Sequence, residues 1–117
     1  MQVAFHKVGE AVVIRPLHGN IDSSSVQDFR RQVFEAVGPA VKHVVLDLSE
    51  VRYVDSSGLS VIISLLKHVG DGGEFHLCGV GEVVATVLRI SRLDRIVKTF
   101  PDEAAAIAAM SAHATKS

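Results

Sequence analysis

The sequence predicts a single α/β domain with a mixed, mainly parallel sheet of about five strands and about four helices. Short apolar runs alternate with amphipathic segments along the chain, an order typical of parallel strands joined by crossover helices. The 117 residues suit one domain, and 48% of them are hydrophobic, which allows a substantial core. We therefore expect residues 1–117 to form one domain, with residues 113–117 as a frayed tail.

The first third of the chain predicts two strands followed by a helix. Val3–Lys7 and Ala11–Pro16 have the composition of a hairpin with a glycine in its turn. Pro16 ends the second strand because proline has no N–H to donate to a neighbouring strand. Leu17–Asp22 is expected to be a loop. Apolar residues then recur at helical spacing over Val26–Val37, and a Gly-Pro pair ends this helix.

The middle of the chain predicts a buried strand and an apolar helix. Val44–Leu48 is almost entirely apolar, as expected for a central strand covered on both faces. Ser49–Val54 is expected to be a loop that leads into a helix ending at Gly70. Helical spacing predicts that the buried side of this helix carries Leu59, Ile62, Ile63, Leu66 and Val69.

The last third continues the alternation of strands and helices. A strand over Glu74–Cys78 precedes a helix over Glu82–Ile90, whose apolar side carries Val83, Val84, Val87 and Leu88. Another strand over Ile96–Phe100 is followed by an alanine-rich helix with Asp102 as its cap. The resulting order is β-β-α-β-α-β-α-β-α, in which only the opening hairpin requires antiparallel pairing.

The composition argues against several classes of function. The formal net charge is −1, which provides no basic footprint for nucleic acid or for anionic lipid. No apolar run approaches the ~20 residues that a membrane-spanning helix needs, and the N-terminus lacks a signal-peptide pattern. Cys78 is the single cysteine, so a reducing compartment and a role as a small core residue are expected. These observations predict a cytoplasmic protein with no membrane insertion and no direct contact with nucleic acid.

The most informative stretch is Asp55-Ser56-Ser57-Gly58, between the central strand and the apolar helix. The first turn of a helix has free N–H groups and a partial positive charge, so a phosphate is stabilised there. Helix capping by Asp55 or a serine is the simpler interpretation. Gly58 adds a constraint, because glycine costs ~1 kcal/mol relative to alanine within a helix. We interpret the glycine at position 58 as marking a place where a partner surface approaches closely or where a hydroxyl is modified.

Together with the preceding strand, this stretch resembles the STAS domain of bacterial anti-sigma factor antagonists. The resemblance lies in Val45–Ser49 and Val54–Leu59, and it extends to Gly19–Asp22, Gly72–Phe75 and Leu88–Leu93. It covers nearly the whole chain, and the Asp-Ser-Ser-Gly element at this place in the order of elements is its most specific part. The resemblance implies a single STAS domain.

The resemblance also implies a function as a phosphorylation-controlled partner switch. Ser56 would be the phosphoacceptor, with Asp22, Asp55, Ser57 and Gly58 on the partner-binding face. The unmodified protein would bind a serine kinase that doubles as an anti-sigma factor, so that a sigma factor is released. Phosphorylation of the serine would end this binding, and a serine phosphatase would restore it. Asn20 and Ser60 depart from the family pattern and are expected to affect partner choice.

A second interpretation keeps the fold but removes the switch. Similar domains are fixed subunits of stress-signalling assemblies or of a lipid-transport ATPase, where the serine region would be a docking surface.

An enzyme is disfavoured: the histidines show no metal-ligand spacing, and Gly79–Val84 lacks the third glycine of a dinucleotide-binding fingerprint. No catalytic residue, cofactor or metal is therefore expected. The basic residues Arg89, Arg92, Arg95 and Lys98 form either a solvated face or a contact with an acidic partner.

Overall fold

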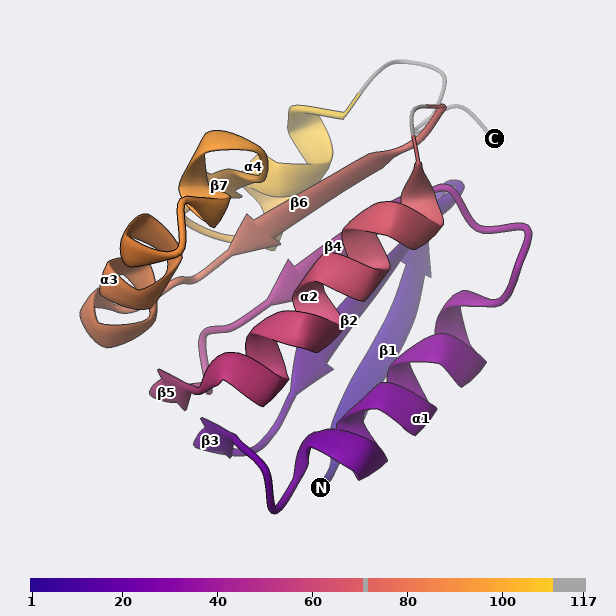
Figure 1. Ribbon diagram of the computed structural model, residues 1–117. Helices are drawn as coiled ribbons and strands as arrows, with labels where there is room; N and C mark the ends of the chain where they lie inside the picture. The colour runs from indigo at the N-terminus through magenta and orange to yellow at the C-terminus, as the bar shows by residue number, and fades with distance from the viewer. Residues whose placement is uncertain (71, 111–117) are drawn as a thin grey trace.

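The computed structural model describes residues 1–70 and 72–110 and is built around one five-stranded sheet (Figure 1). The strand order is β1-β2-β4-β6-β7; β1 is antiparallel to β2, and the other neighbours are parallel. The mixed, mainly parallel α/β sheet predicted from the sequence is confirmed. The strands are β1 (Val3–Val8), β2 (Ala11–Pro16), β4 (His43–Asp47), β6 (Glu74–Cys78) and β7 (Lys98–Phe100).

Helices cover both faces of this sheet. Figure 1 shows α1 (Val26–Val37) and α2 (Ser56–Val69) side by side on one face, whereas α4 (Glu103–Ala108) lies on the other. The third helix, α3 (Glu82–Ile90), lies at the end of the sheet where the parallel strands finish, and the 3-10 turn η1 (Leu93–Arg95) packs against α3 and β7. The expected strand over Ile96–Phe100 is shorter, because η1 delays its start to Lys98.

The core is organised by strand register. Ile14, Leu46 and Leu77 are neighbours on three adjacent strands, and all three are fully buried beneath α1 and α2. The opposite face packs Val13, Val45 and Cys78 against α4. Burial raises the pKa of the Cys78 thiol to about 12, and the nearby carboxylate of Asp47 adds to this effect. The prediction that Cys78 is a core residue is therefore confirmed.

A second, two-stranded parallel sheet was not predicted. It pairs β3 (Asn20–Ile21) with β5 (Tyr53–Val54), inside the two segments expected to be loops. The Gly19 carbonyl accepts hydrogen bonds from the backbone N–H groups of Arg52, at 2.7 Å, and Tyr53, at 3.1 Å. Strands of two residues are too short to show an alternating pattern, so only the tertiary pairing defines them.

The predicted buried faces of two helices are partly wrong. The α2 core side consists of Gly58, Val61, Ile62, Leu65 and Val69. Ile63 is instead exposed, and Leu59 and Leu66 are partly buried. On α3 only Val84 and Leu88 are fully buried, and Val83 is 55% exposed. Both helices carry apolar residues on more than one side, so the packing against the sheet selects the buried face.

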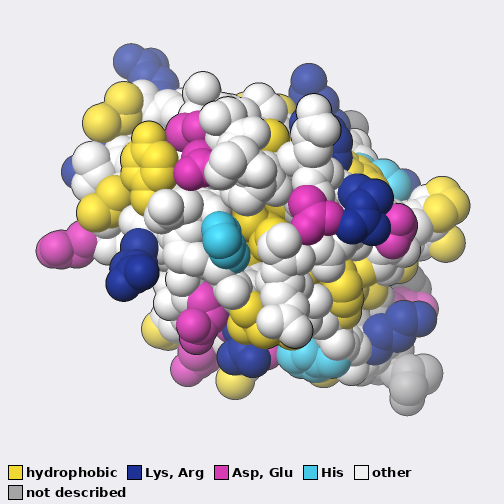
Figure 2. Space-filling model, turned by 90° about the horizontal axis from the view of Figure 1, so that it is seen from below, with side chains coloured by type: hydrophobic (Ala, Val, Ile, Leu, Met, Phe, Trp, Pro, Cys, Tyr) yellow, Lys and Arg dark blue, Asp and Glu magenta, His cyan; other side chains and the backbone are white. Residues whose placement is uncertain are grey.

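The surface mixes both signs of charge. On the face seen in Figure 2, acidic and basic side chains lie interspersed, in keeping with the net charge of −1. Among residues 1–70 and 72–110, no helix is long and apolar enough to cross a membrane. The predicted frayed tail over residues 113–117 lies outside the described part of the chain.

A carboxyl pair lies where α4 meets the sheet. The side chain of Glu103 hydrogen-bonds that of Asp47, which is 6% exposed at the end of β4. This hydrogen bond, with burial, raises the pKa of Glu103 to about 7. Burial opposes ionisation of Asp47, but hydrogen bonds from Glu103 and from the Ser49 N–H lower its pKa overall. The folded pair therefore keeps one proton at pH values where an ordinary glutamic acid has lost it.

We expect this pair to make stability depend on pH. Between the ordinary glutamate pKa of 4.5 and about 7 the folded chain retains a proton that the unfolded chain releases, so stability falls as pH rises through this range. The Glu103→Gln variant keeps a hydrogen-bond donor at every pH and should flatten the dependence. Urea denaturation of both proteins across this range measures the difference. Equal slopes would show that the shared proton contributes nothing.

Candidate functional site

The structure brings the predicted site residues together at the start of α2. Strand β5 ends at Val54, Asp55 is the N-cap of α2, and Ser56 is the first helical residue. The loop between β3 and α1, which contains Asp22, lies against the same helix end, because the backbone N–H of Asp55 donates to the Ile21 carbonyl. We refer to Asp22, Asp55, Ser56 and Ser57 together as the serine site.

The Asp55 carboxylate connects the two segments of the serine site. Its Oδ1 accepts hydrogen bonds from the backbone N–H groups of Ser57, at 2.9 Å, and Gly58, at 3.1 Å. Its Oδ2 accepts a hydrogen bond of 3.1 Å from the backbone N–H of Ser23, in the other segment. Hydrogen bonds from the Ser57 hydroxyl and the Gly58 N–H lower the pKa of Asp55. The carboxylate is therefore charged, and its two oxygens join the start of α2 to the loop that contains Ser23.

Asp22 places a second negative charge beside Asp55. Its Oδ1 accepts hydrogen bonds from the Ser24 hydroxyl, at 2.6 Å, and the Ser24 backbone N–H, at 3.0 Å. These bonds lower the pKa of Asp22, and repulsion from Asp55 acts in the opposite direction. The two carboxylates are therefore close enough to interact, and both residues are partly exposed to solvent.

The two serine hydroxyls differ in their availability. The Ser57 hydroxyl donates a 2.5 Å hydrogen bond to Oδ1 of Asp55, and its side chain is partly buried. Ser56 is exposed, and no described residue forms a hydrogen bond with its hydroxyl. Of the two, Ser56 therefore has the more accessible hydroxyl.

The helix N-terminus offers less to a phosphate than the sequence predicted. The N–H groups of Ser57 and Gly58 are bonded to Asp55, and that of Leu59 donates to the Asp55 carbonyl. In the first turn of α2, the N–H of Ser56 is the one for which no hydrogen bond to a described residue is found. A phosphate on Ser56 would gain from the helix dipole but would not find the other N–H groups free.

The reason for Gly58 also differs from the prediction. A Cβ at this position would lie 2.7 Å from the carbonyl oxygen of Ile21 and 2.7 Å from Cγ1 of Val54. Gly58 is buried, and the close approach is made by the chain's own β3 and β5. The glycine therefore allows the first turn of α2 to pack closely against β3 and β5, next to the serine site. Ile21 and Ser23 were missed as contributors to the site; only the resemblance at Gly19–Asp22 hinted at this segment.

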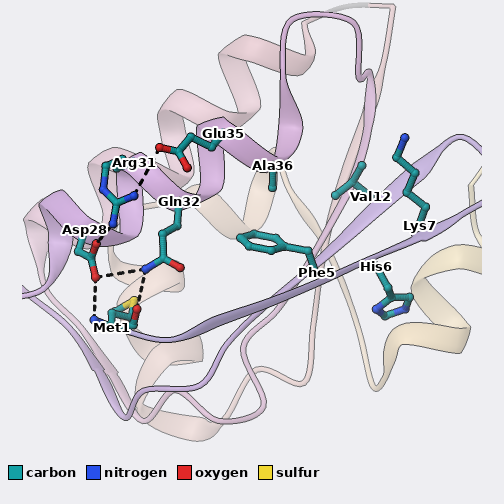
Figure 3. Close-up of a pocket in the computed structure, with 10 residues that line it drawn as sticks. All are labelled: Met1, Phe5, His6, Lys7, Val12, Asp28, Arg31, Gln32, Glu35 and Ala36. Carbon is teal, nitrogen blue, oxygen red and sulfur yellow. Dashed lines mark hydrogen bonds and ion pairs between the residues drawn. The ribbon is translucent and has the colours of Figure 1, made fainter.

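A cavity lies away from the serine site, between β1 and α1 (Figure 3). Its volume is about 710 Å³, and its walls include Phe5, Val12 and Ala36. Arg31 is paired with Asp28 and Glu35 on the α1 side. No residue of the serine site lines this cavity. Within the described residues, no group of three or more His, Cys, Asp or Glu side chains could hold a metal ion.

Comparison with known proteins finds one family. A family model described as the STAS domain matches residues 3–106. A candidate anti-sigma factor antagonist from Thermotoga neapolitana is 37% identical over 81% of this chain and 86% of its own length. The anti-sigma F factor antagonist of Paenibacillus polymyxa is 34% identical over 82% of this chain and 84% of its own length.

Solved structures show the same fold. A candidate anti-sigma factor antagonist from Thermotoga maritima superposes with a TM-score of 0.85 at 29% identity, covering 92% of each chain. The Bacillus cell fate determinant SpoIIAA in its phosphorylated form superposes with a TM-score of 0.67. It is 23% identical over 89% of this chain and 96% of that one, and at this identity the likeness concerns the fold alone.

The Gly58→Ala variant should be destabilised by about 1–3 kcal/mol, because the added methyl group meets the backbone of Ile21. Gly72→Ala is the matched control, since a Cβ there has no neighbour within 4 Å. Urea denaturation of the three proteins gives the free energies. A stable Gly58→Ala protein would show that α2 tolerates a shift away from β3.

Proposed function

Because the chain belongs to the STAS domain family, we propose that it is an anti-sigma factor antagonist switched by phosphorylation of Ser56. The observation that carries the proposal is the free, exposed hydroxyl of Ser56 beside the carboxylates of Asp22 and Asp55. The relatives named as anti-sigma factor antagonists support an anti-sigma factor as the partner.

In the proposed cycle, the unmodified serine site binds an anti-sigma factor that is also a serine kinase, and a sigma factor is released. The kinase transfers the γ-phosphoryl group of ATP to Oγ of Ser56, the hydroxyl proton is lost, and ADP leaves. A serine phosphatase hydrolyses the phosphoester and restores the binding form. The cycle would take place in the cytoplasm, and the chain itself would act as a substrate, not as an enzyme.

Electrostatics explains how one phosphate could end binding without refolding the domain. The phosphate adds about −1.5 to −2 charges next to two existing carboxylates. Like charges brought together across an interface cost several kcal/mol. A hundredfold loss of affinity needs only about 2.8 kcal/mol. Since Asp55 already occupies the helix N–H groups, the phosphate charge would remain directed at the partner.

The site assignment is tested with purified anti-sigma factor kinases from the source genome. Ser57→Ala should still be phosphorylated, whereas Ser56→Ala should not, because only the Ser56 hydroxyl is free. Intact-mass analysis with peptide mapping measures the outcome. Phosphate on Ser57, or undiminished phosphorylation of Ser56→Ala, would contradict the assignment.

The switch is tested by adding charge without phosphate. Ser56→Asp should weaken kinase binding by about tenfold or more, while the melting temperature stays nearly unchanged. Ala40→Asp is the control, since it adds the same charge at an exposed position between α1 and β4. Calorimetry gives both affinities. The fixed-subunit alternative would be favoured by two results together. Ser56→Asp would bind the kinase normally, and the unaltered protein would co-purify with a larger assembly and contain no phosphorylated pool.

A further inference from the structure

The outer side of α3 and η1 carries a surface that neither the core nor the serine site requires. It contains two apolar side chains and four basic ones within a short stretch of chain. We call it the α3 surface: Arg89, Ile90, Arg92, Arg95, Ile96 and Lys98.

The apolar residues of the α3 surface are unusually open to solvent. Ile90 is 77% exposed and Ile96 is 63% exposed, more than any other exposed large hydrophobic residue in the described chain. At the left edge of Figure 2, on the side where α3 lies in Figure 1, hydrophobic side chains lie next to basic ones. Apolar side chains rimmed by charge are typical of protein-binding surfaces.

The basic residues of the α3 surface are not neutralised within the chain. Arg89 donates a 3.4 Å hydrogen bond to the Thr86 hydroxyl. Among residues 1–70 and 72–110, no carboxylate forms an ion pair with Arg89, Arg92, Arg95 or Lys98. Their charge is therefore free to attract an acidic partner.

The backbone conformation of Arg92 gives an independent indication that the α3 surface has a binding role. Its φ of 64° is left-handed, and it is the one non-glycine residue with positive φ in the described chain. Its N–H donates to the Arg89 carbonyl and closes α3, at a position where helices usually have glycine. Arginine costs stability there, and among the described residues its exposed side chain forms no ion pair that offsets this cost. A non-glycine residue in this conformation, with an exposed charged side chain, is a candidate for an external contact.

The α3 surface is continuous with the serine site. α3 packs against β5, and β5 leads directly to Asp55 and Ser56. Figure 1 shows α3, β5 and the start of α2 at the same end of the sheet. A partner that covers Ser56 can therefore extend onto α3.

We propose that the α3 surface is a second docking site for the kinase that acts on Ser56, and that it binds an acidic segment of this partner. Apolar side chains of the segment would cover Ile90 and Ile96. The inference rests on the proposed function and identifies the chemistry of its partner. A protein fits better than an anionic membrane, because Asp94 interrupts the cations and residues 89–98 contain no aromatic side chain to anchor in lipid.

Arg92→Gly provides the sharpest test, because it relieves the backbone and removes the charge together. Its melting temperature should rise, while its affinity for the purified kinase should fall about fivefold in about 0.1 M salt. Arg95→Glu should weaken binding about tenfold. Both losses should shrink in about 1 M salt, where charges are screened. Lys42→Glu, just before β4, is the control and should bind normally.

The outcomes separate this inference from the proposed function. Normal kinase binding by Arg92→Gly and Arg95→Glu, with Ser56→Asp still impaired, would overturn the docking site and leave the switch intact. Failure of the unaltered protein to bind any of the kinases would overturn both. Co-sedimentation with phosphatidylserine vesicles that Arg95→Glu abolishes, with kinase binding unchanged, would replace the protein partner by a membrane.

Discussion

The carboxylate of Asp55 is the interaction on which the arrangement of the serine site depends. One oxygen caps α2, and the other binds the backbone of the loop between β3 and α1, so a single side chain joins segments more than thirty residues apart in sequence. The same carboxylate holds the Ser57 hydroxyl and leaves that of Ser56 free. Because hydrogen bonds keep Asp55 ionised, this arrangement already carries a negative charge before any phosphate is added.

The small β3–β5 sheet gives this carboxylate its geometry. Parallel pairing of Ile21 with Val54 brings the two chain segments side by side, and Gly58 lets the first turn of α2 rest directly on the Ile21 backbone. The β3–β5 sheet lies at the end of the five-stranded sheet where the parallel strands finish, and parallel α/β sheets commonly have their functional sites at this end. The site is thus built from fixed elements, which suits a switch that acts by charge instead of refolding.

The serine site and the α3 surface differ in the sign of their main charges, although the chain as a whole is nearly neutral. The start of α2 carries the carboxylates of Asp22 and Asp55, whereas α3 and η1 carry unpaired cations beside exposed aliphatic side chains. A partner that contacts both regions would be oriented by opposite charges at its two ends. Phosphorylation would change only one of them, so binding could be lost without a change at α3.

The sequence by itself determined the fold class, the order of the main strands and helices, and the place of the serine stretch at a helix start. These features follow from local periodicity, turn residues and capping chemistry, which neighbouring residues encode. Tertiary structure alone decided the β3–β5 pairing, the buried side of α2, the internal reason for Gly58 and the difference between Ser56 and Ser57. Each of these depends on atoms brought close from distant parts of the chain, and no local pattern records such contacts.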